Sequence, residues 1–234
     1  MNDSHTKNFG RRFIAVVGSV VALVSLVSMA APVAVSGVAA QKVVGQNPSA
    51  VIIPDIDPLA FAANQALEQL RDDLVRFDGS AEITHSFIRL RRATAEQVAD
   101  RLDLDADELE AAWADSDINH QTALLAALTQ VGTPYKRFTM KPGIGFDCSG
   151  LTSFAWSQAG FSIPRNSTQQ IRAADPRTPD TAQAGDLLRY PGHVMMWLGV
   201  GQAVIHSPRP RQFVEVKILA PRSMKRSTFG DPTE

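Results

Sequence analysis

The side chain best suited to nucleophilic chemistry is that of Cys148, the only cysteine in the chain. It stands just before a segment in which Leu151, Phe154 and Ala155 recur with helical spacing. We therefore predict that the thiol lies at a helix N-terminus, where unpaired backbone N–H groups and the positive end of the helix dipole stabilise a thiolate. The alternative interpretation is a small buried apolar residue, which describes most free cysteines.

A general base for this thiol is offered by His193, which opens a predicted strand at 193–198. A two-residue turn at Gly199-Val200 would pair His193 with His206, and a slip of two residues would keep both rings on one face. A second ring at the far nitrogen of the base would fix its tautomer and orientation. We predict this third role for His206, with Glu215 or a backbone carbonyl as the alternative.

Other uses of these residue types are disfavoured. Zinc takes three or four ligands, commonly at close paired spacings, whereas Cys148 and His193 are far apart and the chain has neither a second cysteine nor a His-x-x-x-His pair. A serine hydrolase would need a Gly-x-Ser-x-Gly turn between strand and helix, which does not occur. We expect no metal and no cofactor.

The elements around these residues predict an α+β fold. Helices are expected at 120–131 and at 149–159, the second carrying the cysteine at its N-terminus. Four short β-branched or aromatic runs then follow, separated by Pro and Gly, at 186–190, 193–198, 202–206 and 213–218. We predict that the helices pack on an antiparallel sheet that carries the histidines.

Further helices are expected upstream, in a module at 57–117. Pro58 is suited to a first helical position, and leucines follow at helical spacing before Gly79. Thr94-x-x-Gln97 has the form of a capping box that would open the next helix. A short helix after Asp105 would bring Leu109 and Trp113 together.

Charge divides the chain into unlike parts. Between 94 and 117 there are nine acidic residues and one arginine, whereas 136–234 holds thirteen Lys or Arg and seven Asp or Glu. The acidic stretch is interpreted either as a solvated helical face or as a surface that docks on the basic C-terminal domain and regulates access to it. With a formal net charge of -1 overall, nothing favours nucleic acid as a partner.

The first forty residues predict export. Three basic residues, Lys7, Arg11 and Arg12, precede an uncharged apolar stretch at 13–29 that is followed by small residues, the pattern of a secretory signal peptide. We expect 1–40 to be a signal peptide, with an uncleaved anchor as the alternative. The stretch 41–56 is expected to be a linker, and the mature protein to be secreted or in the cell envelope.

Several ordered motifs together resemble the NlpC-type cell-wall peptidases, which are compact papain-like cysteine peptidases. The resemblance runs from about 123 to 218. It is carried by the motifs Gly132-Thr133-Pro134-Tyr135, Phe146-Asp147-Cys148-Ser149-Gly150-Leu151, Ile163-Pro164-Arg165-Asn166-Ser167-Thr168-Gln169-Gln170, Gly185-Asp186-Leu187, Gly192-His193-Val194 and Val204-Ile205-His206-Ser207-Pro208.

The resemblance implies roles for individual residues. It implies Cys148 as nucleophile, His193 as base and His206 as the polar third member. It also implies that Tyr135 lies near the oxyanion and the substrate, and that three further residues contact the peptide: Asp147, Ser149 and Arg165. The sequence departs from the family after Tyr135, where Lys136-Arg137-Phe138-Thr139 replace an aromatic and paired glycines.

The implied activity is hydrolysis of peptidoglycan stem peptides, commonly at the bond from γ-D-glutamyl to a diamino acid. The same site would also serve an N-acetylmuramoyl-L-alanine amidase or an acyl transferase, and a non-catalytic wall-binding scaffold is the remaining alternative. The module at 57–117 is predicted to bind the wall or to regulate the peptidase.

Overall fold

The computed structural model describes residues 56–76 and 83–233, all of which belong to one compact unit. The predicted signal peptide at 1–40 and all but the last residue of the predicted linker lie outside the described residues. Within the described ranges, no helix combines the length and the apolar character needed to cross a bilayer.

The first helices begin at side-chain caps. Helix α1 spans Pro58–Arg76, and the carboxylate of Asp57 accepts a hydrogen bond from the N–H of Leu59. Helix α2 spans His85–Leu102, so the capping box predicted at Thr94 is wrong. The cap is Thr84, whose hydroxyl oxygen accepts from Phe87 N–H. Thr94 is buried in mid-helix and its hydroxyl donates to the carbonyl of Leu90, which removes it from capping.

Two shorter helices follow, each capped by an aspartate. Helix α3 spans Ala106–Asp115 behind Asp105, and helix α4 spans Ile118–Leu128 behind Asp117. Helix α4 therefore begins two residues before the predicted start at His120, because the Asp117 carboxylate accepts hydrogen bonds from the N–H groups of Asn119 and His120.

The four helices and the C-terminal part share one hydrophobic core. Leu59, Val98 and Trp113 lie in the same buried cluster as residues of the sheet and of the helix that follows Cys148. The indole N–H of Trp113 also donates to the carbonyl of Leu198, at 2.8 Å. The module predicted at 57–117 is thus joined to the rest of the protein by apolar packing, and its function stays a prediction.

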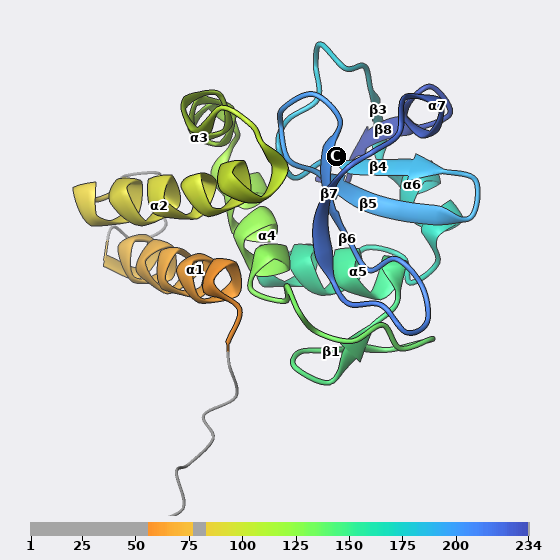
Figure 1. Ribbon diagram of the computed structural model, residues 1–234, viewed down its shortest axis with the longest axis horizontal. Coiled ribbons are helices and arrows are strands. Elements are labelled where there is room, and N and C mark those ends of the chain that lie inside the picture. The colour runs from red at the N-terminus through yellow and green to blue at the C-terminus, as the bar shows by residue number, and fades with distance from the viewer. Residues whose placement is uncertain (1–55, 77–82, 234) are drawn as a thin grey trace, which may run out of the picture. The chain divides into compact units, whose positions relative to one another are not determined.

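The C-terminal part has the predicted α+β architecture (Figure 1). Helix α5 spans Cys148–Gln158 and α6 spans Ser167–Ala173, with a small antiparallel pair β1 (Met140–Lys141) and β2 (Gly145–Phe146) before α5. The main sheet is antiparallel, in the order β3-β8-β4-β5-β6-β7. Its strands are β3 Asp175–Arg177, β4 Leu187–Tyr190, β5 His193–Trp197, β6 Ala203–His206, β7 Glu215–Ile218 and β8 Thr228–Asp231.

Strands β4 to β7 lie within the four predicted runs, whereas β3 and β8 were not predicted. The two sheet faces have separate cores. Val194 and Met196 of β5 pack with Leu151 of α5. On the opposite face Met195 and Trp197 pack with residues that include Met224 of the short helix α7, Pro221–Met224. This alternation places α5 directly on β5.

The hairpin that carries the histidines has a longer loop than predicted. Met196 pairs with Ile205 and Trp197 with Val204. The predicted two-residue turn at 199–200 is therefore wrong, and the register differs from the predicted one by two residues. Gly199 has a φ of +89°, and an added Cβ would lie 2.8 Å from the Cβ of Ala184, so this bend needs glycine. A slip of two residues preserves side-chain faces, which keeps the two histidine rings on one face.

Candidate active site

The thiol of Cys148 lies on the first residue of α5 and is partly buried. Asp147 caps the helix, since its Oδ1 accepts from the N–H of Gly150 at 2.8 Å. Gly150 is needed there, because an added Cβ would lie 2.2 Å from the carbonyl oxygen of Thr139. The thiol is therefore held beside the unpaired N–H groups of the first helical turn.

His193, His206 and Glu215 form a hydrogen-bonded chain across three strands. Nε2 of His193 lies 2.8 Å from Nδ1 of His206, and Nε2 of His206 lies 3.3 Å from Oε1 of Glu215. Both rings are buried. No residue that the structure describes hydrogen-bonds to Nδ1 of His193, which leaves that nitrogen for the reaction.

Burial sets the protonation of both rings. It lowers the pKa of His193 to about 3, with the neighbouring His206 as the second cause. It also lowers the pKa of His206 to about 4, helped by the charge of Lys217. Both imidazoles are therefore neutral at neutral pH, and a neutral imidazole can accept a proton.

Two tyrosines lie near the thiol, and one of them also contacts a histidine. Burial and the charge of Cys148 raise the pKa of Tyr135, and the same two causes raise the pKa of Tyr190. Tyr190 ends β4, pairs with His193, and its ring centroid lies 5.4 Å from that of His193. The sequence interpretation missed Tyr190, although a strand ending one Pro-Gly turn before His193 would have placed it there.

The three predicted peptide contacts lie together beside the thiol. Arg165 donates from Nη2 to Oδ2 of Asp147 and from Nη1 to Oγ of Ser149, both at 2.9 Å. The same Oδ2 accepts from the N–H of Phe138 at 2.6 Å. These side chains line a pocket of about 320 Å³, together with Asn166, Ser167 and Gln169. Their contact with a peptide stays a prediction.

The segment in which the sequence departs from the family forms one wall of this pocket. Phe138 adopts a φ of +58° and its ring is 85% exposed. The guanidinium of Arg137 lies 5.4 Å from the centroid of that ring. An aromatic and a cationic side chain therefore take the place of the paired glycines that are typical of the family.

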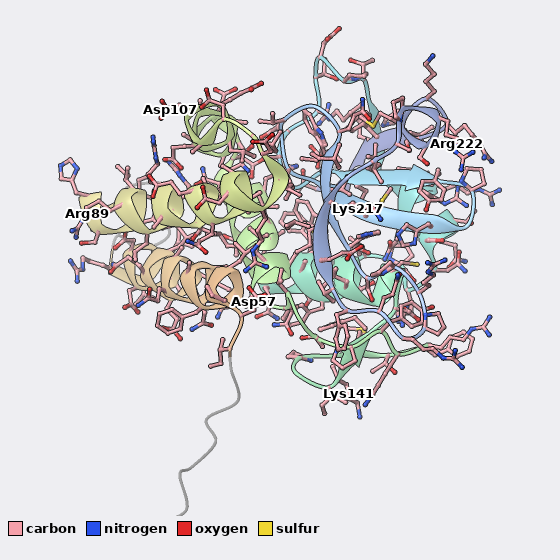
Figure 2. All side chains as sticks on the ribbon, viewed as in Figure 1. Asp57, Arg89, Asp107, Lys141, Lys217 and Arg222 are labelled. Carbon is pink, nitrogen blue, oxygen red and sulfur yellow. The ribbon has the colours of Figure 1, made fainter. Side chains whose placement is uncertain are left out.

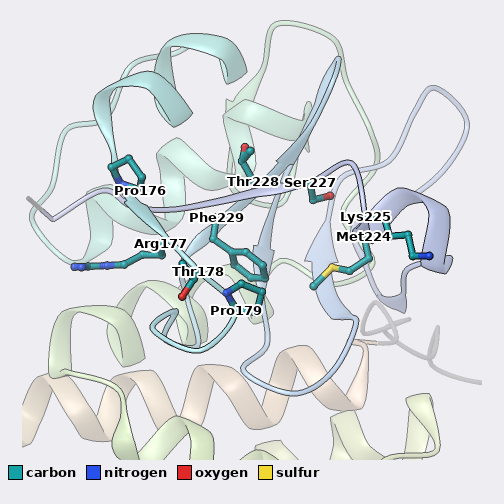
Figure 3. A pocket seen from close by; sticks show the side chains of 9 residues that line it. All are labelled: Pro176, Arg177, Thr178, Pro179, Met224, Lys225, Ser227, Thr228 and Phe229. Carbon is teal, nitrogen blue, oxygen red and sulfur yellow. The ribbon is translucent and has the colours of Figure 1, made fainter.

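A larger pocket of about 510 Å³ lies between β3, β8 and α7 (Figure 3). Phe229, Met224 and Pro179 contribute apolar side chains, and Lys225 is the ammonium group at its α7 side. None of the residues predicted to act in the site lines this pocket, so it is separate from the chemistry of Cys148.

A buried charged cluster around His120 was also missed. The ring is fully buried, with Nδ1 hydrogen-bonded to Asp117 and Nε2 3.0 Å from Asp186 and 3.6 Å from Asp231. Burial lowers the pKa of His120, but the hydrogen bonds to Asp117 and Asp186 outweigh it and raise the pKa to about 9. His120, Asp186 and Asp231 are close enough to hold a metal, but the raised pKa of His120 favours an imidazolium, which has no lone pair to offer a metal.

Comparison with known proteins gives the family of this domain. The model of the NlpC/P60 family matches residues 132–231, and these residues form an NlpC/P60 domain. A protein of Corynebacterium glutamicum named "Probable endopeptidase" is 42% identical over 107 residues, covering 44% of this chain and 50% of that protein. A "Gamma-D-glutamyl-L-lysine dipeptidyl-peptidase" of Bacillus cereus is 36% identical over 94 residues, covering 37% and 28%.

Among solved structures, the peptidoglycan hydrolase RipB of Mycobacterium tuberculosis is similar with 23% identity and a TM-score of 0.46. That likeness covers 78% of this chain and 92% of the solved one. The chain spans about half the length of the first curated relatives that it matches.

Proposed function

We propose that this protein is a cysteine peptidase that hydrolyses peptidoglycan stem peptides. The observation that carries the proposal is the chain from His193 through His206 to Glu215, on an NlpC/P60 domain whose only thiol begins α5. Its parts are a nucleophile, a neutral base and a group that orients the base. The names of the two curated relatives support a peptidase.

The proposed mechanism uses only residues of this chain. Nδ1 of His193 accepts the thiol proton, and the thiolate of Cys148 attacks the amide carbonyl carbon. Backbone N–H groups at the start of α5 stabilise the oxyanion. The protonated His193 then donates to the leaving amine, and the base activates water, which hydrolyses the thioester.

The bond that we propose is the one from γ-D-glutamyl to a diamino acid. The printed name of the Bacillus cereus relative supports this choice. Asp147, Ser149 and Arg165 would hold the acyl side of the peptide, because their pocket adjoins Cys148. Tyr135 would lie near the oxyanion, since its pKa is raised in part by the charge of Cys148.

The test is digestion of purified muropeptides by residues 41–234, wild type beside Cys148→Ala, with products identified by mass spectrometry. Cleavage after γ-D-glutamyl by the wild type alone supports the proposal. Release of the intact stem indicates an amidase, and a product carrying an added amine indicates a transferase. Binding without cleavage by both proteins indicates a wall-binding scaffold.

We further propose that the protein acts in the cell envelope or outside the cell, and that residues 57–117 regulate the peptidase or bind the wall. Deleting these residues is a poor test, because Leu59 and Trp113 lie in the shared core. A better variant neutralises exposed acidic groups that make no described ion pair: Asp100→Asn, Glu108→Gln and Asp115→Asn. Unchanged cleavage and unchanged binding to purified wall would contradict both roles for the acidic face.

A further inference from the structure

A second polar pocket lies on the histidine side of the proposed site. It has a volume of about 380 Å³ and is lined by Tyr190, Arg222, Ser223 and Arg226. Tyr190 contacts the ring of His193 and lies within electrostatic reach of Cys148. Arg222 projects from α7 on the side where β4 and β5 meet at their turn, as Figure 2 shows. Tyr190 therefore both lines this pocket and contacts the proposed base.

Both arginines of this pocket are available to an anion. Each is exposed, and neither makes an ion pair with any residue in the described part of the chain. They are four positions apart, which places them on one side of the short α7 and the turn after it. Two guanidinium groups beside a tyrosine ring suit a carboxylate, because guanidinium offers paired N–H donors that match its two oxygens.

The mechanism assigns this pocket to one side of the scissile bond. The acyl group stays on Cys148 in the thioester, and the amine departs with a proton from His193. The leaving fragment must therefore lie on the imidazole side, where Tyr190 and the arginines are. In a stem peptide that fragment is short and ends in a carboxylate.

We propose that Arg222 and Arg226 form a subsite that binds the carboxylate of the leaving fragment. This inference rests on the proposed peptidase activity. It makes the enzyme select stems with a free C-terminal carboxylate near the cleaved bond over stems in which that group is amidated. The pocket around Arg165 on the acyl side has no part in this selection.

The test compares L-alanyl-γ-D-glutamyl-L-lysyl-D-alanine with its C-terminal amide. The wild type should cleave the free acid with a kcat/KM about fivefold higher, the size expected for exposed charge pairs. The double variant Arg222→Ala, Arg226→Ala should cleave both peptides at the rate at which the wild type cleaves the amide. Arg222→Lys with Arg226→Lys should keep part of the preference.

Lys225→Ala is the matched control. It removes one positive charge from the same turn, but its side chain lines the pocket of Figure 3 instead. The preference for the free acid should survive in this variant. A wild type that treats acid and amide alike, or a double variant that still prefers the acid, would overturn the subsite.

Binding of the same two peptides to Cys148→Ala, measured by calorimetry, separates this proposal from the peptidase activity. If the wild type cleaves neither peptide but Cys148→Ala binds the acid more tightly, with the difference removed by the two arginine substitutions, the activity is wrong and the carboxylate subsite stands. Equal affinities for acid and amide would reject the subsite whether or not cleavage occurs.

Discussion

Nε2 of His193 lies 2.8 Å from Nδ1 of His206, and this contact determines which nitrogen of His193 can act as a base. Glu215 can only accept, so Nε2 of His206 carries a proton and donates to it at 3.3 Å. Because His206 is neutral, its Nδ1 accepts from Nε2–H of His193. The lone pair of His193 is then on Nδ1, the nitrogen without a described partner.

The first prediction follows from this relay. His206→Ala removes the acceptor, so His193 is free to carry its proton on Nδ1 and to rotate. We expect kcat/KM on the stem peptide to fall by about 100-fold or more, by analogy with other triads that lose the orienting residue. Thermal melting should stay near that of the wild type if the loss is catalytic.

A second prediction separates the roles of Glu215. Glu215→Gln keeps an oxygen that accepts from Nε2–H of His206, so kcat/KM should change by less than about tenfold. Glu215→Leu removes that acceptor and should lower kcat/KM further. Equal losses in the two variants would show that the charge of Glu215 matters and its hydrogen-bond acceptance does not.

A third prediction concerns stability against pH. The pKa values of His193 and His206 are lowered in the folded protein. The stability that these two rings contribute is therefore present above about pH 6.5 and is lost as pH falls toward 4 and 3. The pKa of His120 is raised to about 9, so its contribution is complete below pH 6.5 and is lost as pH rises through 9. The free energy of unfolding, measured with urea, should be greatest near pH 6.5.

We expect the loss of stability above pH 6.5 to come from His120. Its shift from 6.5 to about 9 corresponds to about 3 kcal/mol of unfolding free energy. His120→Gln should flatten the curve between pH 6.5 and 9. A variant that still loses stability over that range would assign the effect to other groups.

How far the sequence predicts the site depends on whether its contacts are local. The position of Cys148 at a helix start follows from the apolar spacing after it, and the shared face of His193 and His206 follows from the two-residue period of strands. Arg165 came only from family resemblance, because its contacts with Asp147 and Ser149 span a loop whose path no local rule fixes.

What the sequence interpretation missed depends on tertiary packing. Two of the three partners of His120 lie far along the chain, so its spacing to Asp186 and Asp231 carries no pattern. Strands β3 and β8 are short and pair with each other from distant positions. The capping box at Thr94 has the right letters, but burial of that face in the core outweighs local capping preference.

A fourth prediction tests the buried cluster itself. Asp186→Asn keeps the size of the side chain but removes one of the carboxylates that hold the imidazolium of His120. Breaking a buried ion pair on one side costs about 3–5 kcal/mol, so the urea midpoint at pH 6.5 should fall sharply. Asp107→Asn, which removes an exposed partner of Arg92, should leave the urea midpoint near that of the wild type.

The last prediction concerns the joint between the N-terminal helices and the sheet. Trp113→Phe keeps most of the apolar contact but leaves the carbonyl of Leu198 without its indole donor, for a loss of about 1–3 kcal/mol. Trp113→Ala also opens a cavity in the shared core, and we expect it to cost about 3–5 kcal/mol. Because the core is common, tryptophan fluorescence and far-ultraviolet dichroism should report one unfolding transition in each variant. Two separate transitions would show that the helices fold independently of the peptidase domain.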